Sequence, residues 1–132
     1  MSVVRALGLA ILALPLVAAT ARAPQSPFGD VTLTASPAQY EGKCPVQIDF
    51  FGHVGVTAHP MVFNYHYERS DGAKGGLKVV RVTNPNATWI GVHDHWRLGA
   101  SGQHYHVWEK LFVASGNTRI ATDQVEADIT CK

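Results

Sequence analysis

Four histidines form two His-x-His pairs within residues 91–110, and these pairs are the densest concentration of potential chemistry in the chain. The first pair is His93 and His95, and the second is His104 and His106. Neutral imidazole is a good ligand for both Zn²⁺ and Cu²⁺. A metal site would require the two pairs to lie on one face, so the pairing of the two segments decides the chemistry.

One arrangement is a hairpin closed between Leu98 and Gln103. Its register places His95 opposite His106, with the Cβ atoms of opposite residues about 5 Å apart. All four histidines would then share one face, and three of them could hold Zn²⁺ or Cu²⁺ with an open coordination position. This arrangement predicts a secreted or periplasmic metal-binding protein.

The other arrangement places the two segments in different sheets of a sandwich, which removes the metal site. A smaller exposed patch then remains on one sheet, and we expect it to contain His66, His104, His106 and Trp108. An exposed tryptophan among imidazoles is unusual surface composition and indicates a binding surface. We favour this arrangement, with no cofactor and with a protein or carbohydrate at the cell surface as the partner. A purely structural, scaffolding role beside another copy or another chain is the further alternative.

Period-two alternation recurs through the chain and predicts strands rather than helices. Aromatic and β-branched residues are frequent in these segments, and Gly, Pro, Asn and Asp separate them. Seven short strands in a domain of this size are typical of an antiparallel, immunoglobulin-like β-sandwich. The expected strands fall within residues 31–36, 44–54, 61–72, 77–88, 89–99, 104–116 and 124–131.

Two acidic residues share the inward phase of their strands. Asp94 alternates with Val92 and Trp96, and Glu109 alternates with apolar neighbours. Burying a carboxylate is costly unless it is hydrogen-bonded or paired. We therefore expect a structural role for both acids, and we place Trp96 in the core and Trp108 on the surface.

The N-terminus resembles a secretory signal. Arg5 precedes an apolar run over residues 6–19 and then small residues, a pattern typical of export and too short for a membrane anchor. Cleavage is expected after Ala19 or Ala21. We assign residues 1–21 to the signal peptide, 22–30 to a flexible N-terminal arm and 31–132 to one domain that is secreted or periplasmic, with no membrane span.

Cys44 and Cys131 are the two cysteines of the chain. In an oxidising compartment an even number of cysteines favours a disulfide, although two buried free thiols are the alternative. Without Arg5 the basic and acidic residues balance, which argues against nucleic acid as the main partner. No nucleophile elbow, phosphate loop or free Cys-His arrangement is present, so we expect no enzyme.

The segment "LGASGQHYHV" resembles the corner that enters the sixth strand of fibronectin type III and immunoglobulin-like domains. Leu98, Gly102, Tyr105 and Val107 fit its positions. The resemblance implies that the chain crosses between sheets here and that the Tyr105 hydroxyl bonds back to the turn.

A wider resemblance covers residues 44–131 and relates the chain to an immunoglobulin-like domain of secreted bacterial proteins, whose function is poorly defined. It rests on "CPVQIDFFG", "YHYERSDGA", "VHDHWRLG", "HYHVWEKLFV" and "ITC". Tyr67 stands where that family usually has Trp. The resemblance implies that Cys44 and Cys131 meet at one end of the sandwich, but it implies nothing about the histidines, which fill variable positions.

Overall fold

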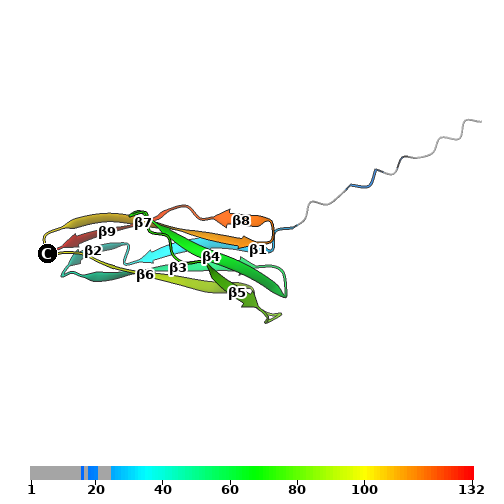
Figure 1. Cartoon of the computed structure of the whole chain (residues 1–132), viewed down its shortest axis with the longest axis horizontal. Helices are drawn as coiled ribbons and strands as arrows, with labels where there is room; N and C mark the ends of the chain where they lie inside the picture. The colour runs from blue at the N-terminus through cyan, green and yellow to red at the C-terminus, as the bar shows by residue number, and fades with distance from the viewer. Residues whose placement is uncertain (1–15, 17, 21–24) are drawn as a thin grey trace, which may run out of the picture.

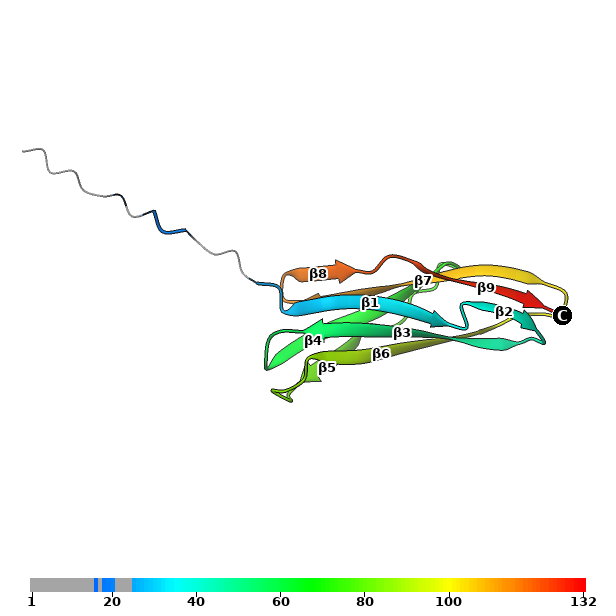
Figure 2. The same ribbon diagram turned by 180° about the vertical axis from the view of Figure 1, so that it is seen from behind.

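The computed structural model describes residues 16, 18–20 and 25–132, and the predicted signal peptide lies almost entirely outside them. Two β-sheets form a sandwich in the described part (Figures 1 and 2). This part of the chain contains no helix that could cross a membrane. The strands are β1 (Phe28–Ser36), β2 (Gln39–Gly42), β3 (Val46–Val56), β4 (Met61–Arg69), β5 (Lys78–Val82), β6 (Trp89–Leu98), β7 (His104–Ser115), β8 (Thr118–Ala121) and β9 (Val125–Cys131).

The smaller sheet has the order β1-β3-β6, and the larger sheet has the order β2-β9-β7-β4-β5 with β8 paired to β7. Alternate residues of the long strands point between the sheets, as period two requires. Ile48 and Phe50 of β3 meet Leu111 of β7 and Ile129 of β9 in this core, and all four are fully buried. The all-β sandwich predicted from the sequence is confirmed.

Nine strands are present in the described residues, rather than the seven that were expected. The two additional strands, β2 and β8, have four residues each and pair only with one neighbouring strand, β2 in parallel with β9 and β8 antiparallel to β7. Strands this short show too little alternation to be recognised. In addition, β1 begins at Phe28, inside the predicted arm, because the Phe28 ring is buried and packs edge-on against Phe63.

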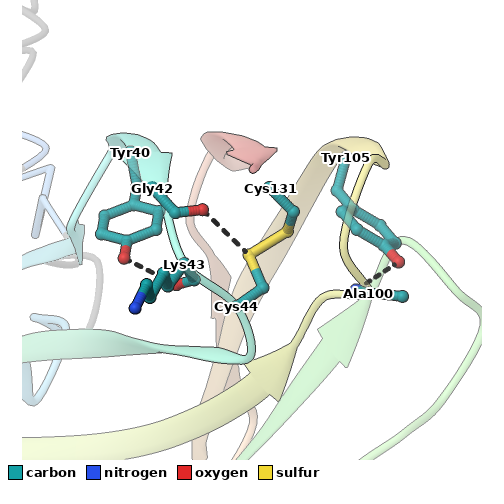
Figure 3. The surroundings of a disulfide bond; sticks show 7 residues. All are labelled: Tyr40, Gly42, Lys43, Cys44, Ala100, Tyr105 and Cys131. Carbon is teal, nitrogen blue, oxygen red and sulfur yellow. Dashed lines mark hydrogen bonds between the residues drawn. A yellow bond between two sulfur atoms is a disulfide. The ribbon is translucent and has the colours of Figure 1, made fainter.

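A disulfide joins Cys44 to Cys131 at the end of the sandwich where the chain terminates (Figure 3). The predicted corner lies beside it. The Tyr105 hydroxyl accepts a hydrogen bond from the Ala100 amide at 3.0 Å. Gly102 has a φ of 77° and donates its amide to the Cys131 carbonyl, a left-handed conformation that glycine adopts without steric cost. The corner and the disulfide therefore fix the same end of the domain.

The hairpin arrangement is wrong. β6 pairs with β3 along its whole length, whereas β7 pairs with β4, β8 and β9 in the other sheet. The two His-x-His pairs consequently lie on opposite outer faces of the sandwich. The four-histidine site for Zn²⁺ or Cu²⁺, built from His93, His95, His104 and His106, does not form.

Candidate functional site

The second histidine pair forms a cluster with two acids on the outer face of the larger sheet. The histidine–acid cluster consists of His104 and His106 on β7 and Glu126 and Asp128 on β9. His104 Nε2 lies 2.6 Å from Asp128 Oδ1, and the two ring nitrogens of His106 lie 3.4 Å from Asp128 and 3.5 Å from Glu126. Asp128 directly faces His106 across the strands.

Electrostatics in the histidine–acid cluster follow from these contacts. Hydrogen bonding to Asp128, and then to Glu126, raises the pKa of His106 above its usual value. Hydrogen bonds from His104 and His106 hold the pKa of Asp128 below its usual range. These side chains are exposed to solvent, so water screens their interactions and each pair contributes little to stability.

His66 does not join His104 and His106 as expected. It lies opposite Phe112, six residues further along β7 than His106, which is roughly 20 Å along a strand. Its ring stacks on Phe112 with centroids 4.9 Å apart. Trp108 does lie next to the cluster, opposite Glu126, but it is partly buried. The predicted patch is therefore divided into two separate places.

Two hollows open on the larger sheet. One, of about 580 Å³, borders the histidine–acid cluster and is lined by polar groups of β2 and β9. The other, of about 550 Å³, lies beside His66, where Leu77, Phe112 and Ile120 contribute apolar lining. Val62, Leu77 and Val79 are exposed aliphatic side chains near this second hollow.

The first histidine pair lies on a different kind of surface, on the outer side of β3 and β6. We call this surface the aromatic face and define it by eight outward side chains: Gln47, Asp49, Phe51, His53, Trp89, His93, His95 and Arg97. The Trp89 indole is 49% exposed and stacks on His53, with centroids 5.0 Å apart and planes inclined by 19°. Phe51 packs edge-on against Trp89 and lies 4.9 Å from the His93 ring.

Gly91 makes room for these rings. A Cβ atom at this position would lie 2.9 Å from the Phe51 ring and 3.4 Å from the Trp89 ring, the first of which is too close for carbon atoms. The Phe51 ring therefore rests against the bare backbone of β6. A side chain at position 91 would displace the aromatic rings from the sheet surface.

The other end of the aromatic face is polar. Gln47 donates a hydrogen bond to Asp49 Oδ1 at 2.8 Å, and His95 Nδ1 lies 2.5 Å from the same oxygen. The hydrogen bonds from Gln47 and from His95 hold the pKa of Asp49 below its usual value. Because Asp49 accepts the Nδ1 proton, neutral His95 presents Nε2 to solvent as a hydrogen-bond acceptor.

Asp49, Phe51, His53 and Trp89 were missed by the sequence analysis. The signal was nonetheless present, because the outward phase of β3 is opposite to Ile48 and Phe50, and it contains Phe51 and His53. Recognising the cluster also required the pairing of β3 with β6, which places His53 opposite Gly91 and Phe51 opposite His93. The pattern of a single strand does not contain that information.

A third group of titratable side chains lies between the sheets. Asp94 and Glu109, the inward acid pair, point between the sheets as the sequence predicts; Asp94 is partly buried and Glu109 is fully buried. Neither oxygen of Glu109 has a hydrogen-bond partner. Burial, with a further contribution from the neighbouring Asp94 carboxyl, raises the pKa of Glu109 to about 9. Glu109 is therefore protonated and uncharged at neutral pH.

Arg69 lies near the inward acid pair, opposite Glu109 across β4 and β7. Its guanidinium group lies 3.9 Å above the Trp96 ring and forms an ion pair with Asp71 at 2.6 Å. A cation over an indole face is attracted by the ring quadrupole. Tyr67 also reaches across the core and donates its hydroxyl to the Val92 carbonyl at 3.0 Å. These contacts tie β4 to β6 in the opposite sheet.

Within residues 25–132 and the few described before them, no three His, Cys, Asp or Glu side chains are placed to hold a metal ion. In the histidine–acid cluster the imidazoles point at carboxylates, and on the aromatic face His95 is engaged by Asp49. The chemistry that these surfaces offer is hydrogen bonding, charge and ring stacking.

Known proteins resemble this chain in fold. No family model and no curated protein matches the sequence. Among solved structures, the chain is similar to the CARDB domain of the PF1109 protein from Pyrococcus furiosus, determined in complex with di-metal ions, at 10% sequence identity and a TM-score of 0.56. The match covers 83% of this chain and 100% of that domain. The chain therefore has an immunoglobulin-like β-sandwich fold.

Proposed function

We propose that this chain is an exported, non-catalytic immunoglobulin-like module that binds a partner at the cell surface through its aromatic face. The observation that carries the proposal is the packed cluster of Phe51, His53 and Trp89, in which a half-exposed indole is held by stacking on the outside of a sheet. Exposed tryptophan that is rigidly placed is typical of the residues that dominate binding energy.

A binding role agrees better with the titratable groups than an enzymatic one does. Glu109 has the largest pKa shift among the carboxyl groups of the described residues, and such shifts often mark catalytic sites. It is sealed in the core, however, with no exposed surface, so a substrate has no access to it. The other perturbed carboxylates, Asp49, Asp71 and Asp128, lie at the surface, and their pKa values are lowered by hydrogen-bond donors.

Export is supported by the apolar N-terminal segment and by the disulfide. A Cys44–Cys131 bond persists in an oxidising compartment such as the periplasm or the cell exterior. A metal-carrier role is not favoured, because the two His-x-His pairs lie on opposite faces.

The test compares two outward-facing tryptophans on opposite faces, the exposed Trp89 and the partly buried Trp108. The mature domain is labelled and sedimented with cell envelopes of the organism from which the sequence comes. We expect Trp89→Ala to reduce the bound fraction at least tenfold, and Trp108→Ala to leave it unchanged. Loss with Trp108→Ala alone would instead assign binding to the histidine–acid cluster. A domain that never sediments with envelopes would contradict the proposal.

A further inference from the structure

The aromatic face has a composition that distinguishes it from an ordinary protein-binding surface. Its two apolar members are aromatic rings, and its other six side chains can all form hydrogen bonds. The outward residues of the neighbouring β1 are Thr32, Thr34 and Ser36, so this sheet presents no aliphatic side chain among the paired outward positions of the three strands. The core of a protein interface is largely apolar and depleted of charged residues, whereas only two of the eight side chains of the aromatic face are apolar.

The larger sheet provides the contrast. Its second hollow is lined in part by Leu77, and the exposed aliphatic side chains of Val62 and Val79 lie on the adjacent strands β4 and β5. A protein partner that buries apolar side chains would find a better match there. The aromatic face matches a molecule that offers flat C–H surfaces together with many hydroxyl groups, which is the chemistry of a sugar ring.

The geometry of the rings supports stacking with such a ligand. His53 covers part of the Trp89 indole, and yet half of the residue is exposed. Phe51 is wedged between Trp89 and His93 and rests on Gly91. Because neighbouring rings already hold the indole in place, little conformational entropy remains to be lost when a ligand stacks on it.

Polar groups continue from the rings along the same strand. His93, His95 and Arg97 follow Trp89 on the outward side of β6, and the distance from residue 89 to residue 97 is roughly 26 Å along an extended strand. That length accommodates several linked sugar units. His95 Nε2 can accept a hydrogen bond from a hydroxyl group, whereas Arg97 donates.

Charge on the aromatic face indicates a neutral ligand. Asp49 and Arg97 carry the formal charges among its eight residues and offset one another at neutral pH. A polyanion would be expected to select a basic face. From composition, ring geometry and charge together, we infer that the aromatic face binds a neutral glycan chain, stacking one sugar on Trp89 and bonding the next units through His93, His95 and Arg97.

This inference rests on the proposed function and adds the class of ligand. The test is ¹H–¹⁵N NMR titration of the mature, oxidised domain with three neutral oligosaccharides as probes: hexamers of β-1,4-linked glucose, of β-1,4-linked N-acetylglucosamine and of α-1,6-linked mannose. We expect at least one of them to shift the Trp89 indole N–H signal and the amides of β3 and β6, while the Trp108 indole stays unchanged.

Three substitutions at one position separate stacking from simple apolar contact. Trp89→Phe keeps an aromatic face and should weaken oligosaccharide binding only severalfold. Trp89→Leu keeps apolar bulk without a ring and should weaken it at least tenfold, as should Trp89→Ala. Equal binding by the Leu variant and the unchanged protein would overturn the stacking argument. Trp89 is half-exposed, so these variants should fold, and the amide spectrum verifies that directly.

The outcomes also separate this inference from the proposed function. If no probe at 10 mM shifts the aromatic face, while envelope binding depends on Trp89 and is destroyed by protease, then the ligand is a protein and the glycan inference is wrong. If neither oligosaccharide binding nor envelope binding depends on Trp89, both the inference and the proposed function fail. Envelope binding that survives protease but is lost after periodate oxidation of the sugars supports both.

Discussion

Glu109 and Asp128 lie on adjacent strands of the larger sheet, but they lie on opposite sides of it. Glu109 points between the sheets and is fully buried without a hydrogen-bond partner, whereas Asp128 lies outside and contacts two histidines. Their pKa values move in opposite directions as a result. Strand phase alone decides this, because one step along a strand exchanges the core for solvent.

The difference between these two carboxyl groups also determines which of them makes the folding stability depend on pH. A raised pKa in the folded state means that the folded protein holds the proton more tightly than the unfolded chain does. The stability linked to Glu109 is therefore fully present below pH 4.5, the ordinary value for Glu, and is lost as pH rises towards about 9. Asp128 has the opposite sign, but its exposure makes its contribution small.

Glu109→Gln is expected to have the largest effect. The amide has nearly the same shape and cannot ionise, so the variant should lose most of the decline in unfolding free energy between pH 5 and pH 9. That decline approaches about 1.4 kcal/mol per pH unit in the unchanged protein. At pH 8, which lies 3.5 pH units above the ordinary pKa of Glu, the variant should be more stable by on the order of 5 kcal/mol, as measured by urea unfolding.

The matched control for this experiment is Glu126→Gln, which changes the same functional group on the exposed side of the neighbouring strand. It should leave the pH profile of stability almost unchanged. If Glu109→Gln and the unchanged protein had parallel profiles of stability against pH, burial would not raise the pKa of Glu109.

Arg69→Met should have the next largest effect. Methionine retains apolar cover over Trp96 but removes the cation that lies 3.9 Å above the ring, which contributes about 1 kcal/mol. Arg69 also lowers the pKa of Glu109, so its removal should raise that pKa further. Urea unfolding at pH 6 measures the first effect. Lys78→Met, which removes a cation 6.0 Å from the Tyr65 ring, should change stability by much less.

Tyr67→Phe removes a hydroxyl that donates across the core to β6 at 3.0 Å. The Val92 carbonyl is then left without this donor, and we expect a loss of about 1 kcal/mol. Thermal unfolding measures it. Tyr40→Phe is the control, because it removes a hydroxyl bond to the Lys43 carbonyl near the surface, where water can replace the hydroxyl. If Tyr40→Phe lost as much stability as Tyr67→Phe, burial would not explain the effect of Tyr67→Phe.

Asp128→Asn should have the smallest effect on stability and a clear effect on titration. Asp128 is the main cause of the raised pKa of His106, so the variant should lower that pKa towards its ordinary value. NMR titration of the imidazole signals measures the change, and the unfolding midpoint should stay the same. Asp49→Asn on the aromatic face is the control. In that variant the pKa of His106 should stay as high as it is in the unchanged protein. An unmoved His106 pKa in Asp128→Asn would contradict the contact.

Much of the fold follows from local patterns. The inward phases of β3, β6 and β7 were readable from alternation, and so were the inward positions of Asp94 and Glu109. The resemblance to an immunoglobulin-like corner implied that the Tyr105 hydroxyl bonds to the backbone of the turn, and the structure identifies the donor as the Ala100 amide. β2 and β8 were not readable, because each has only four residues and none of them is buried, so an apolar inward phase is missing.

The candidate site was harder to predict, because it depends on which strands pair and in which register. His66 shares a sheet face with His104 and His106, but the register of β4 against β7 places it opposite Phe112 instead. The aromatic face combines residues of β3 and β6 that are 36 or more positions apart in the sequence, as Trp89 and His53 are. Nonlocal register of this kind is fixed by the packed core and not by either strand alone.

The position of the disulfide has a consequence for how the domain would bear mechanical load. Cys44 and Cys131 lie at the end of the sandwich near Lys132, and β1 begins at the opposite end (Figure 2). A pull between Phe28 and Lys132 would pass from Lys132 through Cys131 and the disulfide to Cys44, so residues 45–130 would carry no tension. Only residues 28–43 could be drawn out, a contour length of at most about 55 Å. The covalent loop, which includes the whole aromatic face, would stay folded while β1 and β2 acted as a short extensible tether.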